Sequence, residues 1–408
     1  MTPPTIRHYG FAIAIAKAGT GLFFLINTWL VIDITGRPSS GAVALIVTVL
    51  PGILVAPFLG VMVDRGRPAV MAVGAELLRG AMLAIHALLI SMGAASEALA
   101  YGVAFAVALG TELQVLAWRA AISRDAPPEQ MFRLNALTVV GGQSGQILGA
   151  AASGFVLAAL GAVDTVLLAA CTFLVAALIG CGVARRLTLL QPAAASRPCG
   201  PMVYLHELRS GLRHLRERPQ VAFFYGLILF NLTVVFGING LLAPFVRDVL
   251  HLGPEAFGKI DAGYALGAIG GGLLIVPLSR RIGRRAVLLA AFLVAAASLA
   301  AFAQAGGLAV AVLAYIGLGL SFQVNVISLS AAQHATEGPF QGRVAASFSF
   351  LNGVVALVVY GVIGVCVEQH WMRQFYTVQA LAMLGLFVLV LASTRRGSIG
   401  SLLRPAMP

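Results

Sequence analysis

Charged residues are scarce in this chain. Asp, Glu, Lys and Arg make up only 10% of its 408 residues, while 59% of the residues are hydrophobic. Charged residues form about 25% of an ordinary soluble domain, so this composition excludes a water-soluble globular protein. The apolar runs are long and uninterrupted, which excludes a transmembrane barrel, because barrel strands alternate polar and apolar side chains. We therefore predict an all-α integral membrane protein.

Cysteine is also rare, and residues with catalytic spacing are lacking. The four cysteines show neither metal-ligand spacing nor a disulfide framework and are expected to be small packing residues; they are Cys171, Cys181, Cys199 and Cys366. No histidine set, nucleophile elbow or phosphate-binding lysine appears. The sequence thus predicts a protein that is not an enzyme and has no metal, cofactor or nucleotide.

Twelve apolar runs are long enough to cross a membrane. A helix needs roughly 20 apolar residues to span about 30 Å of hydrocarbon. The predicted spans cover residues 11–32, 41–62, 69–92, 98–118, 134–160, 163–183, 221–246, 256–278, 286–303, 308–330, 344–367 and 375–391. Residues 1–9 lead directly into the first span, so no cleavable signal is expected.

The basic residues collect on one side of these spans, which explains the net charge of +12 without a nucleic-acid partner. Only Arg37, Arg247, Lys259 and Arg373 fall in connections on the opposite side. Positive charge accumulates in cytoplasmic loops. We therefore predict that both termini are cytoplasmic and that the protein is a multi-pass protein of the cell (inner) membrane.

The longest hydrophilic stretch separates two sets of six spans. We predict an N-terminal bundle over residues 1–184, a cytoplasmic linker over 185–219 and a C-terminal bundle over 220–408. Residues 203–218 have the spacing of an amphipathic helix that ends at Pro219. Its arginines either lie against anionic lipid headgroups or are simply solvated. Two six-helix repeats are a transporter architecture, with substrate bound between the halves near the midplane.

A short polar turn interrupts the apolar pattern between the second and third spans. It contains Gly60, Asp64, Arg65, Gly66 and Arg67, and a related basic segment at 277–285 occupies the same place in the second half. This pattern, over essentially the whole chain, resembles the major facilitator superfamily, whose loop signature is Gly-x-Leu-Ala-Asp-Arg-x-Gly-Arg-Arg. This chain lacks one residue of the signature between Arg65 and Gly66. The resemblance implies that Asp64, Arg65 and Arg67 form a charge network that latches the outward-facing state.

Two further segments point to a branch of that family. Residues 205–219 resemble the linker of siderophore exporters and drug-efflux proteins, a branch that also includes lysophospholipid transporters. The fifth span carries Gly145, Gly149 and Gly154, similar to a glycine motif of family antiporters, although Ala150 replaces the motif's proline. Small residues also permit close helix packing, which would explain the glycines without any antiport.

Four charged residues fall inside predicted spans, all in the first half: Lys17, Glu76, Arg79 and Glu112. Each costs about 2.5 to 3.5 kcal/mol at a span centre on insertion scales, so each is expected to have a partner or a wet cavity. Glu76 and Arg79 are three residues apart and can pair. Glu112 is the candidate for proton coupling, because buried carboxyl groups can exchange protons near neutral pH. The alternative is a permanent salt bridge from Glu112 to Lys17 or Arg119.

The second half offers amides and aromatic rings in place of charges. Apolar walls with a few polar groups suit an amphipathic ligand, and the candidate cavity residues are Asn231, Asn239, Tyr264, Gln323, Asn325 and Asn352. Some of these amides are expected to join helices instead. Asp33, Asp248 and Asp261 are interpreted as solvated ends of external loops, with gating as the alternative.

These patterns predict a monomeric secondary transporter that exports small amphipathic compounds, such as siderophores or drugs, in exchange for protons by alternating access. A proton-independent facilitator or lysophospholipid transporter is the first alternative. A non-transporting receptor is the second alternative. Such a receptor is expected to carry an appended signalling domain, for which residues 1–9 and 394–408 are too short.

Overall fold

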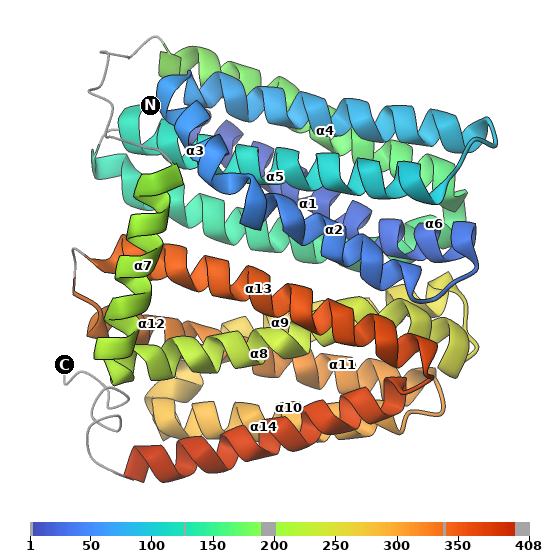
Figure 1. The fold of residues 1–408 in the computed structure, drawn as a ribbon, viewed down its shortest axis with the longest axis vertical. Helices are drawn as coiled ribbons and strands as arrows, with labels where there is room; N and C mark the ends of the chain where they lie inside the picture. The colour runs from blue at the N-terminus through green and yellow to red at the C-terminus, as the bar shows by residue number, and fades with distance from the viewer. Residues whose placement is uncertain (1–2, 126–127, 189–200, 338–339, 396–408) are drawn as a thin grey trace. The chain divides into compact units, whose positions relative to one another are not determined.

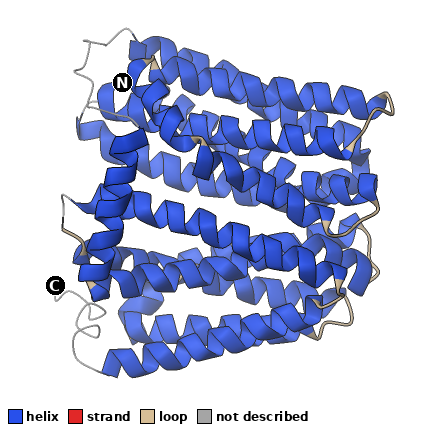
Figure 2. Ribbon diagram, in the orientation of Figure 1, coloured by secondary structure: helices blue, strands red, loops and turns tan. Residues whose placement is uncertain are grey.

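The computed structural model describes residues 3–125, 128–188, 201–337 and 340–395, and these residues form helices joined by short loops, with no strand among them (Figure 2). In chain order the helices, of which the α-helices are labelled in Figure 1, are α1 (Pro3–Thr35), α2 (Ser40–Leu54), α3 (Ala56–Arg65), α4 (Pro68–Ser91), α5 (Glu97–Asp125), α6 (Pro128–Thr188), α7 (Pro201–Glu217), α8 (Pro219–Pro244), the π-helix η1 (Phe245–Val249), α9 (Pro254–Ile282), α10 (Arg284–Ala303), α11 (Leu308–Phe322), α12 (Asn325–Ala335), α13 (Gln341–Glu368) and α14 (Met372–Arg395).

Twelve spans follow from these helices. Ten helical segments of the described chain are long and apolar enough to cross a membrane. One of them, Val140–Arg186, has 47 residues and contains Gly161 with a φ of 80°, a conformation that suits glycine, so it holds two spans. The remaining span consists of α2 and α3, which are separated only by Val55. The predicted all-α fold of twelve transmembrane helices is confirmed.

Two of the spans are broken within the membrane. Pro57 follows the first residue of α3 and has no N–H to continue the hydrogen-bond ladder of α2, which accounts for the break there. The second break lies at Gln323 and Val324, between α11 and α12, where the Val324 N–H donates to the Ser321 carbonyl at 3.2 Å. Broken helices in transporters expose backbone groups near substrate and ion sites.

The chain divides into two compact units, Met1–Leu205 and His206–Pro408, and the division falls inside α7. The predicted boundaries at 184 and 219 stay a prediction. In the first unit α1 and α4 pack along α6, and α2 and α4 pack on α5. In the second unit α8 packs on α12 and α13, α9 on α11, and α10 on α11 and α14.

Both units are apolar inside and outside. An edge-to-face pair of Tyr9 and Trp118, with ring centroids 5.2 Å apart, fills one end of the first unit. In the second unit Phe302 packs against Tyr315 and Tyr376 with centroids 4.6 and 4.9 Å apart. Large apolar side chains also cover the outer surface, where Leu178 and Leu273 are 75% and 74% exposed. Such a surface is stable in lipid rather than in water.

Candidate functional site

A buried arginine anchors the charged residues of the first unit. Arg79 on α4 is completely buried and donates to the carboxylate of Glu76 one turn earlier on the same helix. Its Nη1 also donates to the hydroxyls of Thr20 on α1, at 3.3 Å, and Thr111 on α5, at 3.2 Å. The predicted pairing of Glu76 with Arg79 is confirmed, and Arg79 links three helices.

The packing around Arg79 leaves little room for movement. Its guanidinium carbon lies 4.2 Å from the ring centre of Phe173 on α6, a cation–π contact. A Cβ on Gly110 of α5 would lie 2.7 Å from the Cγ of Arg79, so the stem of the side chain occupies the space that this glycine leaves. Thr20, Thr111 and Phe173 are partners that the sequence did not reveal, because they come from three other helices.

Glu112 on α5 has different surroundings. A Cβ on Gly52 of α2 would lie 3.3 Å from the Oε1 of Glu112, so the carboxylate lies against the backbone of α2. Lys17 and Arg119 are the cations whose charge acts on it, but no ion pair or hydrogen bond joins either of them to Glu112 within the described chain. The alternative of a permanent salt bridge from Glu112 to Lys17 or Arg119 is therefore not formed in this structure.

Lys17 connects the two acids electrostatically. It lies on α1 beside Gly142 of α6, whose Cβ would be 3.6 Å from the Lys17 Cγ. The charges of Glu112, Glu76 and Arg79 all act on its ammonium group. The structure thus brings all four predicted intramembrane charges of the first unit into one network. Within it, Glu76 and Arg79 are locked together, whereas Lys17 and Glu112 have no direct partner among the described residues.

The turn between α3 and α4 consists of two residues. Gly66 follows α3 and donates its N–H to the Met62 carbonyl at 3.0 Å, and Arg67 precedes α4. Arg65 and Arg67 are exposed and form no ion pair among the described side chains. Gly60 lies inside α3, and the side chain of Asp64 lies outside the described residues. The latch therefore stays a prediction from the family resemblance.

Two glycines of the motif on α6 lie in close contact with α1. A Cβ on Gly145 would lie 2.1 Å from the Ala14 carbonyl oxygen, and one on Gly149 would lie 1.9 Å from that of Ala18, both on α1. Gly154 is buried further along α6. The second unit repeats this device, since a Cβ on Gly267 of α9 would lie 1.9 Å from the Ile316 carbonyl oxygen of α11. Close packing thus accounts for these glycines, and an antiport role stays a prediction.

The predicted amide residues of the second unit fall into two groups. Asn231 on α8 donates to the Oδ1 of Asn325 on α12 at 3.0 Å, so this pair joins two helices beside the break between α11 and α12. Asn239 forms a hydrogen bond with the Tyr360 hydroxyl of α13. By contrast, the buried Oδ1 of Asn352 has no hydrogen-bond partner among the described residues.

Tyr264 on α9 and Gln323, at the break between α11 and α12, extend this polar region. Gln323 lies at the break itself, and its Cγ would be 2.9 Å from a Cβ on Gly271 of α9. The rings of Tyr264 and Phe322 have centroids 6.4 Å apart. The candidate residues thus come from α8, α9, α12, α13 and the break between α11 and α12, and no hydrogen bond within the described residues joins the amide of Gln323 or Asn352 to another helix.

The interpretation of Asp261 as a solvated loop end is wrong. Asp261 is only 8% exposed, because α9 already begins at Pro254 and the residue therefore lies two turns inside the helix. No hydrogen bond or ion pair to it is found in the described chain. Its charge acts on Tyr264 and Tyr315. The second unit therefore also contains a buried acid, contrary to the prediction that intramembrane charges occur in the first half alone.

Two six-helix units with broken spans and a buried charge network define a membrane transporter. The family model of the Major Facilitator Superfamily matches residues 9–359 and again residues 224–402, so the chain belongs to this superfamily. A search of curated proteins found no match.

Solved structures of three transporters share the fold. The nucleoside transporter NupG is 14% identical, with a TM-score of 0.66, over 95% of this chain and 99% of that one. The POT family transporter PepTSo is 12% identical, with a TM-score of 0.69, over 98% and 99%. A bacterial homologue of the iron transporter ferroportin, in an inward-facing state, is 14% identical, with a TM-score of 0.69, over 96% and 99%. At these identities the likeness concerns the fold alone.

Proposed function

We propose that this protein is a proton-coupled exporter of small amphipathic compounds, and that Glu112 carries the proton. The observation that supports this role most strongly is the contrast between the two acids of the first unit. Glu76 is fixed in a pair with Arg79, whereas Glu112 is partly buried without a direct partner in the described chain and lies within electrostatic reach of Lys17. An ionisable group inside the membrane without a fixed partner is a natural proton carrier.

The transport cycle would couple this charge to substrate. When Glu112 is ionised, Lys17 stabilises it through space; when Glu112 takes up a proton, Lys17 loses that attraction and its surroundings change. Alternating access would let Glu112 exchange protons with one side of the membrane at a time. Asp261, which is buried and forms no ion pair with a described residue, is a second candidate carrier in the other unit.

Substrate selectivity would come from the amide and aromatic groups of the second unit. Gln323, Asn352 and Tyr264 offer hydrogen-bonding groups among apolar side chains, a combination that suits amphipathic molecules. Siderophores and drugs are the proposed classes, and a proton-independent facilitator or lysophospholipid transporter is the alternative. The excess of Lys and Arg on one side supports cytoplasmic termini in the inner membrane, and we propose that the protein acts as a monomer.

Glu112→Gln is expected to abolish substrate accumulation driven by a pH gradient while leaving substrate exchange at equilibrium within about twofold of wild type, because exchange needs no net proton movement. Transport by purified protein in liposomes measures both quantities. The matched control is Glu97→Gln, the same change on the same helix. Glu97 lies at the start of α5 and pairs with the exposed Arg37 at 2.5 Å, so this variant should keep full coupling. Unchanged coupling in Glu112→Gln would exclude Glu112 as the proton carrier.

A further inference from the structure

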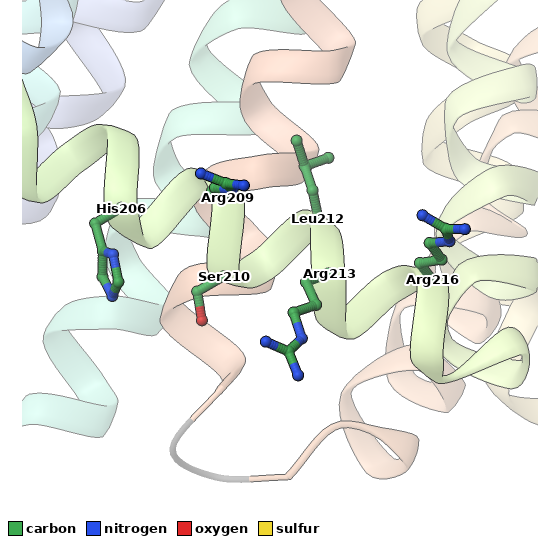
Figure 3. A pocket seen from close by; sticks show the side chains of 6 residues that line it. All are labelled: His206, Arg209, Ser210, Leu212, Arg213 and Arg216. Atoms are coloured by element: carbon green, nitrogen blue, oxygen red, sulfur yellow. The ribbon is translucent and has the colours of Figure 1, made fainter.

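We propose that a basic groove on α7 binds the phosphate headgroup of an anionic phospholipid in the leaflet next to this helix. The groove has a volume of about 670 Å³, and its walls come from successive turns of α7 (Figure 3). The residues that line it are His206, Arg209, Ser210, Leu212, Arg213 and Arg216. Among the described residues, three arginines and no acid line the groove, so its charge is complementary to a phosphate.

The opposite face of α7 fixes the helix on α13. A Cβ on Gly211 would lie 2.3 Å from the Arg343 carbonyl oxygen, so the two backbones are in close contact. The Ser347 hydroxyl donates to the Leu208 carbonyl at 2.9 Å, and the ring of His214 stacks on Phe340 with centroids 4.4 Å apart. The arginines of α7 therefore project from a helix whose position is fixed by packing, so the groove is preorganised for a ligand.

Two of the three arginines are available to an anion. Arg209 and Arg216 are exposed and form no ion pair with any described residue. Arg213 donates to Glu217 at 2.7 Å, and this hydrogen bond lowers the pKa of the exposed Glu217 carboxyl. Exposed pairs of this kind contribute little to stability, so Arg213 can exchange Glu217 for a phosphate. Guanidinium groups bind phosphate oxygens in bidentate fashion, which a set of lysines would not do.

The position of α7 favours a lipid over free phosphate. Only Arg218 separates the end of α7 from α8, which crosses the membrane, so the groove lies next to a membrane span. The same helix exposes apolar side chains beside its cations: Met202 is 79% exposed, Leu205 56% and Leu212 36%. Apolar side chains flanking arginines are typical of helices that lie in the membrane interface, with cations at headgroup level and apolar groups below.

The test measures lipid binding to the full-length protein by native mass spectrometry in detergent. Wild type is expected to bind phosphatidylglycerol about tenfold to 100-fold more tightly than phosphatidylcholine of the same chain length. The variant Arg209→Gln/Arg213→Gln/Arg216→Gln should lose this preference. The control Arg280→Gln/Arg281→Gln/Arg284→Gln removes as many arginines from the end of α9 and the start of α10 and should keep this preference.

Two results would overturn the proposal. If both triple variants lost the preference for phosphatidylglycerol equally, the binding would depend on the total positive charge of the protein and not on the groove. Displacement of phosphatidylglycerol by millimolar inorganic phosphate would mean that the groove is a site for free anions.

The Gly211→Val variant adds a test of geometry, since it keeps every arginine but clashes with α13. It should weaken the preference for phosphatidylglycerol about as much as the loss of one arginine. None of these measurements depends on transport activity, so they are independent of the proposed exporter function.

Discussion

Gly149→Ala is expected to destabilise the protein by about 3 kcal/mol, the upper end of the range for overpacking. The added methyl group would lie 1.9 Å from the carbonyl oxygen and 2.7 Å from the carbonyl carbon of Ala18. Both atoms belong to the backbone of α1, so no side chain can turn aside and the two helices must separate. The fraction of monodisperse protein that remains after heating in detergent measures this effect.

The control for Gly149 is Gly182, which lies in the second of the two spans that form α6. A Cβ on Gly182 meets nothing within 4 Å, and Gly182 is exposed. Gly182→Ala should therefore be neutral or stabilising by about 0.5 to 1 kcal/mol, because alanine favours the helix. Gly149→Ala should thus lower the stability of the protein, whereas Gly182→Ala should not. If Gly149→Ala kept wild-type stability but lost transport, the glycine would serve an antiport motif rather than helix packing.

Arg79→Met is expected to cost about 3 to 5 kcal/mol of stability, because it leaves the carboxylate of Glu76 buried without its cation. Methionine fills similar space, so little of the loss comes from a cavity. The hydroxyls of Thr20 and Thr111 also lose their donor, while both can still bond to carbonyls of their own helices, as they do now at 3.0 and 2.9 Å. Thermal stability in detergent, at equal protein concentration, measures the change.

The double variant Glu76→Met/Arg79→Met separates pairing from packing. With both charges removed, no unpaired buried ion remains, and replacing a buried pair by apolar side chains is often neutral or stabilising. The double variant should therefore recover most of the stability lost in Arg79→Met, giving a large coupling energy in the double-mutant cycle. A double variant as unstable as Arg79→Met would show that the contacts of Arg79 with Thr20, Thr111 and Phe173 dominate instead.

The spans could be predicted because each is a local property of the sequence. Length and hydrophobicity locate them, and a turn of two residues at Gly66 and Arg67 separates α3 from α4. The pair of Glu76 and Arg79 was also predictable, since residues three apart share a helix face. The close connection of the fifth and sixth spans through Gly161 could not be predicted, because a single glycine there takes the place of a recognisable loop.

Contacts between helices could not be read from the sequence. Asp261 was interpreted as a solvated loop end because it lies near the external end of the predicted span 256–278, but α9 already starts at Pro254, packs on α11 and buries Asp261. Asn231 and Asn325 are 94 residues apart, and only the packing of α8 on α12 reveals their hydrogen bond. The sequence could not decide whether Glu112 forms a salt bridge. In the structure the packing of the helices places its carboxylate against the backbone of Gly52 instead.

The most direct test of the central claim measures proton movement coupled to substrate. Inside-out vesicles containing the protein are given an acid interior, and siderophores, cationic dyes and lysolipids are added in turn while the pH gradient is recorded. Proton antiport predicts that one class of compound dissipates the gradient, and that the same compound has no effect in vesicles containing the Glu112→Gln protein. A labelled compound that crosses the membrane without changing the gradient would contradict proton coupling and establish a facilitator.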